Sequence, residues 1–169
     1  MTTATKAPPM TKSKPSYPHV LTLPTDRTIR VERTFNAKRD RVWKAMTDPK
    51  LLAQWWGRGN PLTVERYEFE KGGHWRFVEH SDHGDHGFEG RYREITPIER
   101  ISMTFEWDGM PGHSAVNTLT LTDLGDGRTK MVAESFFMTA EERDGMVASG
   151  MEGGMAKSYA ALDKLLATL

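Results

Sequence analysis

The most conspicuous residues that could do chemistry lie in the run EHSDHGDHG. It contains His80, His83 and His86 together with Asp82 and Asp85, and imidazoles and carboxylates are ligands for divalent metals. The run is broken by glycine, however, and its spacing fits no metal-binding motif. A solvated turn between two strands is the favoured interpretation, so we predict no metal, cofactor or catalytic residue here.

Acid–base catalysis would need a carboxylate held inside the fold. Glu106 alternates with the apolar residues of its strand and is expected on the solvated face, whereas the apolar neighbours of Glu134 leave its direction open. No Ser/His/Asp order, phosphate-binding glycine loop or dinucleotide fingerprint occurs. The chain also has no Cys, which excludes disulfides, thiolate metal sites and cysteine nucleophiles.

A second unusual feature is the tryptophan pair in DPKLLAQWWG. Neighbouring side chains on a helix point about 100° apart, so Trp55 and Trp56 cannot easily share one core position. Leu51, Leu52 and Trp55 share one face, which we expect to meet the domain body and the methionines of the C-terminal helix. Trp56 is expected at the mouth of a pocket, where its ring would cover an apolar ligand. Packing of both indoles in the core is the alternative.

The elements that position these side chains follow from the period of the apolar pattern. Residues 26–35 alternate and predict a strand, with Ile29, Val31 and Phe35 on one face. Two short helices follow and are separated at Pro49. Beyond them, alternating segments joined by short turns predict six consecutive antiparallel strands, each with one solvated face.

The last segment has a helical period. Thr139 and Glu142 form a capping box, and the apolar stripe beyond it predicts one long amphipathic helix through Met151, Met155, Ser158, Leu162, Leu165 and Leu169. Gly150, Gly153 and Gly154 fall within this helix, each costing about 1 kcal/mol relative to Ala. They either allow close packing on the sheet or leave a pocket walled by Met146, Met151 and Met155.

Together these elements predict an α+β domain over residues 26–169, in which a curved antiparallel sheet grips the C-terminal helix. Residues 1–25 are rich in Thr, Lys and Pro and carry no acidic residue, which predicts a flexible N-terminal arm. Docking of this basic arm on a partner is a less favoured alternative.

Composition excludes several classes of function. Lys and Arg number 23, and so do Asp and Glu, which argues against a nucleic-acid or membrane-surface binder. No apolar run approaches the roughly 20 residues of a membrane span, and the start lacks the apolar core of a signal peptide. We therefore expect a cytoplasmic monomer or homodimer that does not insert into membranes.

Three stretches carry a family resemblance. VERTFNAKRDRVWKAMTDPKLLAQWWG resembles the opening of the SRPBCC (START-like) superfamily, in the branch of the C-terminal domain of the activator of heat-shock protein 90 ATPase. GRYREITPIERISMTFEW and SGMEGGMAKSYAALDKLL match the same branch, so the resemblance covers roughly residues 26–169. It implies a helix-grip fold, a chaperone as partner and a role in the stress response. Two-domain activators carry a further N-terminal domain where this chain has its short arm, and Lys38 stands where the branch often has Pro.

The favoured function is binding of a small hydrophobic ligand, without chemistry, in an internal cavity between the sheet and the C-terminal helix. A chaperone cofactor acting through its surface is the first alternative, and a cyclase or hydrolase acting on an apolar substrate is the second. The expected ligand-binding residues are Trp55, Trp56, Trp75, Phe77, Tyr92, Met103, Phe105, Trp107, Gly150, Met151, Gly154 and Met155.

Overall fold

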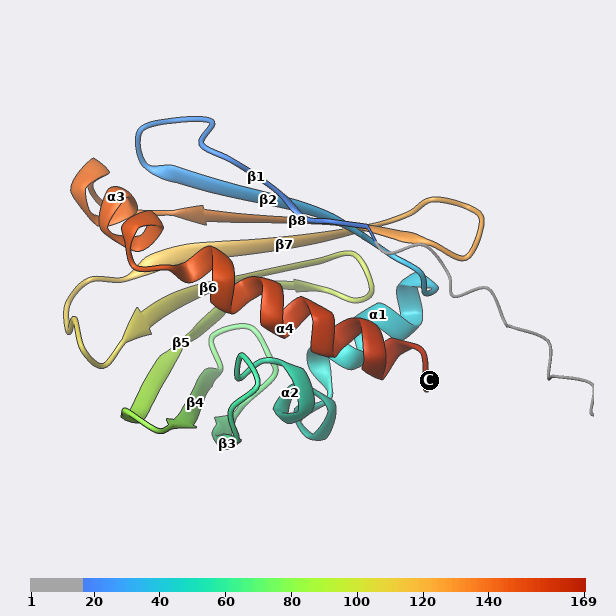
Figure 1. Cartoon of the computed structure of the whole chain (residues 1–169), viewed down its shortest axis with the longest axis horizontal. Helices are drawn as coiled ribbons and strands as arrows, with labels where there is room; N and C mark the ends of the chain where they lie inside the picture. Colours follow the sequence, from blue (N-terminus) through green and yellow to red (C-terminus); the bar gives the residue numbers. More distant parts are fainter. Residues whose placement is uncertain (1–16) are drawn as a thin grey trace, which may run out of the picture.

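A single curved sheet forms the body of the protein. The computed structural model describes residues 17–169. Within this part, eight antiparallel strands lie in the order β1-β2-β8-β7-β6-β5-β4-β3 (Figure 1). Their bounds are β1 Val20–Thr22, β2 Thr28–Phe35, β3 Leu62–Tyr67, β4 His74–Ser81, β5 Gly84–Thr96, β6 Arg100–Trp107, β7 Ala115–Asp123 and β8 Thr129–Phe136.

Four helices accompany the sheet: α1 Arg39–Thr47, α2 Pro49–Trp55, α3 Ala140–Ala148 and α4 Met151–Leu166. Helix α4 crosses the concave face, which we call the inner face, α1 and α2 pack beside it, and α3 lies at the far end (Figure 1). The predicted helix-grip α+β fold is confirmed. Two short helices lie between β2 and β3, and β3 to β8 form the predicted meander.

The two short helices end and begin as the sequence predicts. Pro49 occupies the first turn of α2, where its missing N–H costs nothing, and the side chain of Asp48 accepts a hydrogen bond from the Lys50 N–H. Val42 and Met46 of α1, and Leu52 of α2, are buried against the sheet and α4. This packing fixes the chain direction into the following residues Trp55 and Trp56.

A buried arginine joins the first long strand to α4. Alternation places Ile29, Val31 and Phe35 on the inner face, and it places Arg33 there too, at 8% exposure. The Arg33 guanidinium donates to both carboxylate oxygens of Asp163 on α4, at 3.1 and 2.6 Å. It also lies over the Phe35 ring, 4.9 Å from the centroid. A buried cation needs such partners, because an unpaired one would lose its hydration without compensation.

The arm boundary predicted at residue 25 is wrong for the segment that forms β1. Val20–Thr22 pair with Arg30–Glu32 at the edge of the sheet, and Leu21 packs against the core. His19 contacts Glu152 of α4 at 2.9 Å, so this segment is joined to the helix as well as to the sheet. The rest of the predicted arm, residues 1–16, lies outside the described residues.

The predicted single C-terminal helix is in fact two helices. Thr139 caps α3 by accepting a hydrogen bond from the Glu142 N–H, as the capping box predicts. The chain then turns at Gly150, whose φ of 81° lies in the left-handed region that glycine enters without steric cost. Gly150 is therefore the N-cap of α4 and not an interior helix position.

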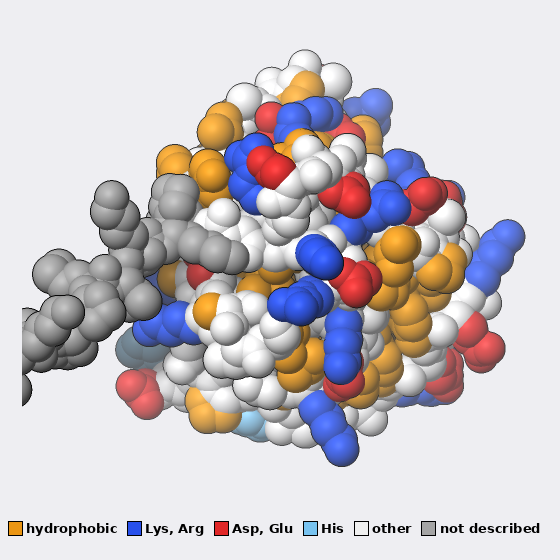
Figure 2. All heavy atoms as spheres, turned by 90° about the vertical axis from the view of Figure 1, so that its right-hand side faces the viewer, with side chains coloured by type: hydrophobic (Ala, Val, Ile, Leu, Met, Phe, Trp, Pro, Cys, Tyr) orange, Lys and Arg blue, Asp and Glu red, His pale blue; other side chains and the backbone are white. Residues whose placement is uncertain are grey.

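The described surface mixes both charge signs. On the face shown in Figure 2, acidic and basic side chains are interspersed with separate apolar patches, as expected from equal numbers of each sign. No helix within residues 17–169 is long and apolar enough to cross a membrane.

Loss of the partner of Arg33 is expected to destabilise the fold. Asp163→Asn should lower the free energy of unfolding by about 1–3 kcal/mol, less than for a fully buried pair because the Asp163 side chain is 37% exposed. Glu94→Gln, which breaks the exposed pair with Arg100, should change it by less than about 0.5 kcal/mol. Urea unfolding measures both, and equal losses would show that the burial of Arg33 is unimportant.

The helix break gives a second prediction. Gly150→Ala should destabilise the protein by about 1–2 kcal/mol, because Ala is strained at positive φ. Gly153→Ala should stabilise it by up to about 1 kcal/mol, because Gly153 is helical and its Cβ would meet open space. Thermal melting compares the two variants, and stabilisation by both would indicate one continuous helix.

Candidate functional site on the inner face of the sheet

Helix α4 covers the inner face unevenly. Near β2 and α1, inward side chains such as Phe35, Val42 and Leu162 are fully buried at 0% exposure. Towards β5, β6 and the first turns of α4, apolar side chains that pack on the core remain partly exposed. We call these the apolar patch, which consists of Trp56, Phe88, Met103, Phe105, Met151 and Met155.

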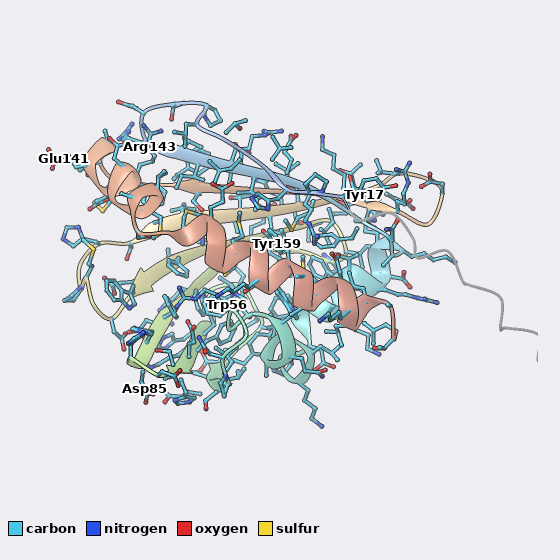
Figure 3. All side chains as sticks on the ribbon, in the orientation of Figure 1. Tyr17, Trp56, Asp85, Glu141, Arg143 and Tyr159 are labelled. Atoms are coloured by element: carbon cyan, nitrogen blue, oxygen red, sulfur yellow. The ribbon has the colours of Figure 1, made fainter. Side chains whose placement is uncertain are left out.

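The two adjacent tryptophans have different surroundings. The Trp55 ring is buried, and its indole N–H donates to the Ala45 carbonyl of α1 at 2.9 Å. Trp56 instead projects onto the inner face of the sheet (Figure 3), where it meets Phe77 and Phe88 edge-on at centroid distances of 5.4 and 5.2 Å. Trp55 is thus a core residue, and the predicted contact of Trp56 with a ligand stays a prediction.

Three of the predicted residues form the floor beneath the patch. Trp75, Phe77 and Tyr92 are buried on the inner face, and Trp75 packs against Phe77 with a centroid distance of 4.9 Å. The Trp75 indole N–H is buried without a hydrogen-bond partner among residues 17–169. Burial raises the pKa of the Tyr92 phenol well above its usual value, so this hydroxyl stays protonated.

Two predicted residues lie at the border of the patch. Trp107 ends β6 at 38% exposure, and its ring folds back against Gly109 of the following turn. Gly150 is exposed at the junction of α3 and α4. Trp107 is thus the strand neighbour of Phe88 across the β5–β6 pairing, Gly150 directly precedes Met151, and contact of either residue with a ligand stays a prediction.

Sequence reasoning missed a buried carboxylate, Glu79, which is 0% exposed. Strand alternation places it on the inner face with Trp75 and Phe77, so the signal was present: a charged residue at a core position of β4. Its oxygens accept hydrogen bonds from Arg58 Nε at 3.2 Å, Arg58 Nη2 at 2.6 Å and Asn60 Nδ2 at 2.6 Å.

The pair is held in place by the loop after α2. Arg58 has a φ of 55° and stands between Gly57 and Gly59, in a region that a side-chain-bearing residue rarely adopts. Its backbone N–H donates to Ser158 Oγ of α4 at 3.1 Å, and that hydroxyl donates to the Trp56 carbonyl at 3.1 Å. The loop is therefore attached to α4 as well as to β4.

Gly154 has a structural role at this point. A Cβ on Gly154 would lie 2.5 Å from Arg58 Cδ, so the missing side chain gives room to the arginine stem. Of the two interpretations of this glycine, the geometry favours close packing over a space left for a ligand. Gly153 lies in the same turn and has no neighbour within 4 Å of an added Cβ.

The other chemical candidates face away from α4. Glu134 lies on the outer face within 3.7 Å of Arg30, and Glu106 accepts a hydrogen bond there from the Gly112 N–H at 2.6 Å. His80 pairs with Asp85 at 2.8 Å near the tip of the β4–β5 hairpin (Figure 3). Among residues 17–169, no three His, Asp or Glu side chains gather closely enough to hold a metal.

The two best-formed surface depressions also lie on the outer face. One, of about 450 Å³, is lined by Arg93, Glu94, Ser102, Val116, Thr118 and Phe136. The other, of about 330 Å³, is lined by His74, Glu89, Gly90, Arg91, Thr104, Glu106 and Ser114. Neither borders α4, so the internal cavity between helix and sheet stays a prediction.

The contact with Arg58 yields a prediction for Gly154. Gly154→Ala should destabilise the protein by about 1–3 kcal/mol through overpacking, although alanine is the better helix former. In an Arg58→Ala, Glu79→Gln background, which removes the stem and both charges, the same change should cost little. Urea unfolding of the four proteins measures the coupling, and an equal cost in both backgrounds would place the clash elsewhere.

Comparisons with known proteins agree with this architecture. The family described as "Activator of Hsp90 ATPase homolog 1-like protein" matches residues 36–167. A crystal structure from Rhodobacter sphaeroides is 30% identical over 90% of this chain and 99% of its own, with a TM-score of 0.82. Protein CV1439 from Chromobacterium violaceum is 29% identical over 82% of this chain and 96% of its own, with a TM-score of 0.70.

Protein Ms6760 from Mycobacterium smegmatis is 20% identical over 88% of this chain and 97% of its own, with a TM-score of 0.79, and supports the fold alone. No curated protein matches. The family match covers most of the sheet and all four helices. This chain therefore belongs to the family of activator of Hsp90 ATPase homolog 1-like proteins, and it has the START-like fold that its sequence predicts.

Proposed function

We propose that this protein binds a small hydrophobic molecule at the apolar patch, between α4 and strands β4 to β6. One observation carries the proposal: large apolar side chains near β5, β6 and the first turns of α4 remain partly exposed on the inner face, whereas Phe35, Val42 and Leu162 near β2 and α1 are fully buried. Exposed apolar area on a concave surface is typical of ligand sites, because a bound apolar molecule removes it from water.

Two features suit this role. Met151 and Met155 contribute flexible thioether side chains, which can move aside and adapt to different ligand shapes. Trp56 offers a ring whose edge-on contacts with Phe77 and Phe88 leave part of its surface exposed. The flat Trp56 ring and the flexible methionines favour recognition of a ligand by its shape and apolar area, with few polar contacts.

Binding is favoured over catalysis at this site. Glu79 is the inward carboxylate that an enzyme would require, but Arg58 and Asn60 occupy its oxygens and it has no exposed surface. A general base must reach the proton it removes, and this carboxylate is already committed to its own partners. We therefore assign Glu79 a positioning role.

A chaperone cofactor is the second candidate, and family membership favours it. Exposed apolar side chains near α3 and the ends of β6 and β8 offer a surface for such a partner: Trp107, Met110, Phe136, Met138 and Val147. Isothermal titration calorimetry with purified heat-shock protein 90 tests this candidate. A heat of binding that is present in the wild type and absent in Met138→Ser would support it. Cytoplasmic location, a stress role and the oligomeric state stay predictions from the sequence.

The proposed site predicts a specific effect of Trp56. Trp56→Ala should weaken binding of the fluorescent apolar probe N-phenylnaphthylamine by roughly tenfold, since an aromatic contact contributes about 1 kcal/mol or more. Trp43→Ala is the matched control, because Trp43 is also partly buried, but its ring packs against Phe69, 6.2 Å away, which is not a patch residue. Fluorescence titration measures both. Equal probe affinity in the two variants would contradict the site.

A further inference from the structure

The Arg58 guanidinium uses only part of its hydrogen-bonding capacity within the fold. Nε and Nη2 donate to Glu79, whereas Nη1 makes no hydrogen bond to any residue among 17–169. The Arg58 side chain is 43% exposed, and that of Glu79 is 1% exposed. Glu79 therefore fixes the plane of the cation and leaves its other edge, Nη1 with the second hydrogen of Nη2, unused by the fold, with Nη1 3.5 Å from where a Cβ on Gly154 would lie.

This free edge lies beside the apolar patch. The Arg58 stem packs on Gly154, in the first turns of α4, with the patch residues Met151 and Met155 on either side along the helix. Trp56 precedes Arg58 by two residues and reaches the same inner face of the sheet. An apolar molecule resting on the patch would thus have one end within reach of a guanidinium.

Stability alone is a poor reason for this arrangement. A buried ion pair stabilises a fold little more than a well-packed apolar pair would, and here it also holds Arg58 at a φ of 55°. Local strain that surrounding contacts maintain is characteristic of residues kept in position for binding. The loop delivers a cation in a fixed orientation at the border of an apolar surface.

We propose that the ligand of the apolar patch is an amphipathic acid, whose carboxylate binds end-on to the free edge of Arg58. This inference rests on the proposed function and adds the chemical class of the ligand. A carboxylate matches the guanidinium edge with two parallel hydrogen bonds. The carboxylates of Glu79 and of the ligand then occupy different edges of one planar cation. Asn60 also stabilises the Glu79 carboxylate by donating a hydrogen bond to it.

The first turn of α4 assists the same charge. Its N-cap is Gly150, which has no side-chain oxygen, so the first N–H groups of this 16-residue helix are not capped by a side chain. The positive end of the helix dipole therefore lies in the turns that contact Arg58, and it favours negative charge there in addition to that of Glu152, the acidic residue of the first turn, which pairs with His19.

A matched pair of probes tests the proposal: dansyl-labelled undecanoic acid and its uncharged methyl ester, titrated by fluorescence at neutral pH. The wild-type protein should bind the acid roughly tenfold or more tightly than the ester, as expected for a charge-assisted bidentate contact, and added salt should reduce this preference. In the Arg58→Gln, Glu79→Gln variant, which leaves no buried charge unpaired, the preference should disappear while ester binding is retained.

Lys157→Gln is the control for general electrostatics, because it removes a positive charge from the exposed side of α4 and should preserve the preference for the acid. Equal binding of acid and ester by the wild type would overturn the acid assignment while leaving the apolar site intact. Failure of both probes to bind would overturn the proposed function too. The wild-type comparison decides between these outcomes even if the double variant does not fold.

Discussion

One buried charge governs the local design of this protein. Glu79 has no exposed surface, and a carboxylate removed from water must be matched by a nearby cation or lose several kcal/mol. Arg58 supplies that cation, and much else follows. The loop between Gly57 and Gly59 takes a left-handed turn to deliver it, Gly154 must lack a side chain to admit its stem, and Ser158 fixes the backbone. The same loop directs Trp56 onto Phe77 and Phe88.

Helix α4 is thereby attached to both sides of the curved sheet. Towards its C-terminal end, Asp163 binds Arg33 of β2, and towards its N-terminal end the loop after α2 links it to β4. Between these attachments the inner face is filled by close packing near β2 and by partly exposed aromatic and methionine side chains near β5 and β6. A rigid frame with an incompletely covered apolar area is well suited to binding, because the frame need not reorganise when the area is filled.

Much of this fold could be predicted, because it follows from periodicity. Alternation in residues 26–35 and in the meander gave correct strands and faces, and Pro49 separated the short helices. Three features could not be obtained that way. β1 has three residues, too few to show a period, and the break at Gly150 is marked by a glycine at positive φ, a helix-end signal that the apolar period does not contain. Glu79 and Arg33 fit the alternation, but a charged residue is normally expected on the solvated face of a strand. Each is buried because it pairs with an oppositely charged residue, Arg58 for Glu79 and Asp163 for Arg33, which lie 21 and 130 residues away in the chain.

The central claim is that apolar molecules bind beside Trp56 on the inner face. The most direct measurement is a proton–nitrogen correlation spectrum of the five tryptophan indoles during titration with N-phenylnaphthylamine, with each signal assigned by Trp→Phe substitution. The account predicts that the Trp56 signal moves with probe concentration, while those of Trp43 and Trp55, which pack around α1, stay in place. A titration that moves only Trp43 or Trp107, or that leaves Trp56 unchanged at saturating probe, would contradict it.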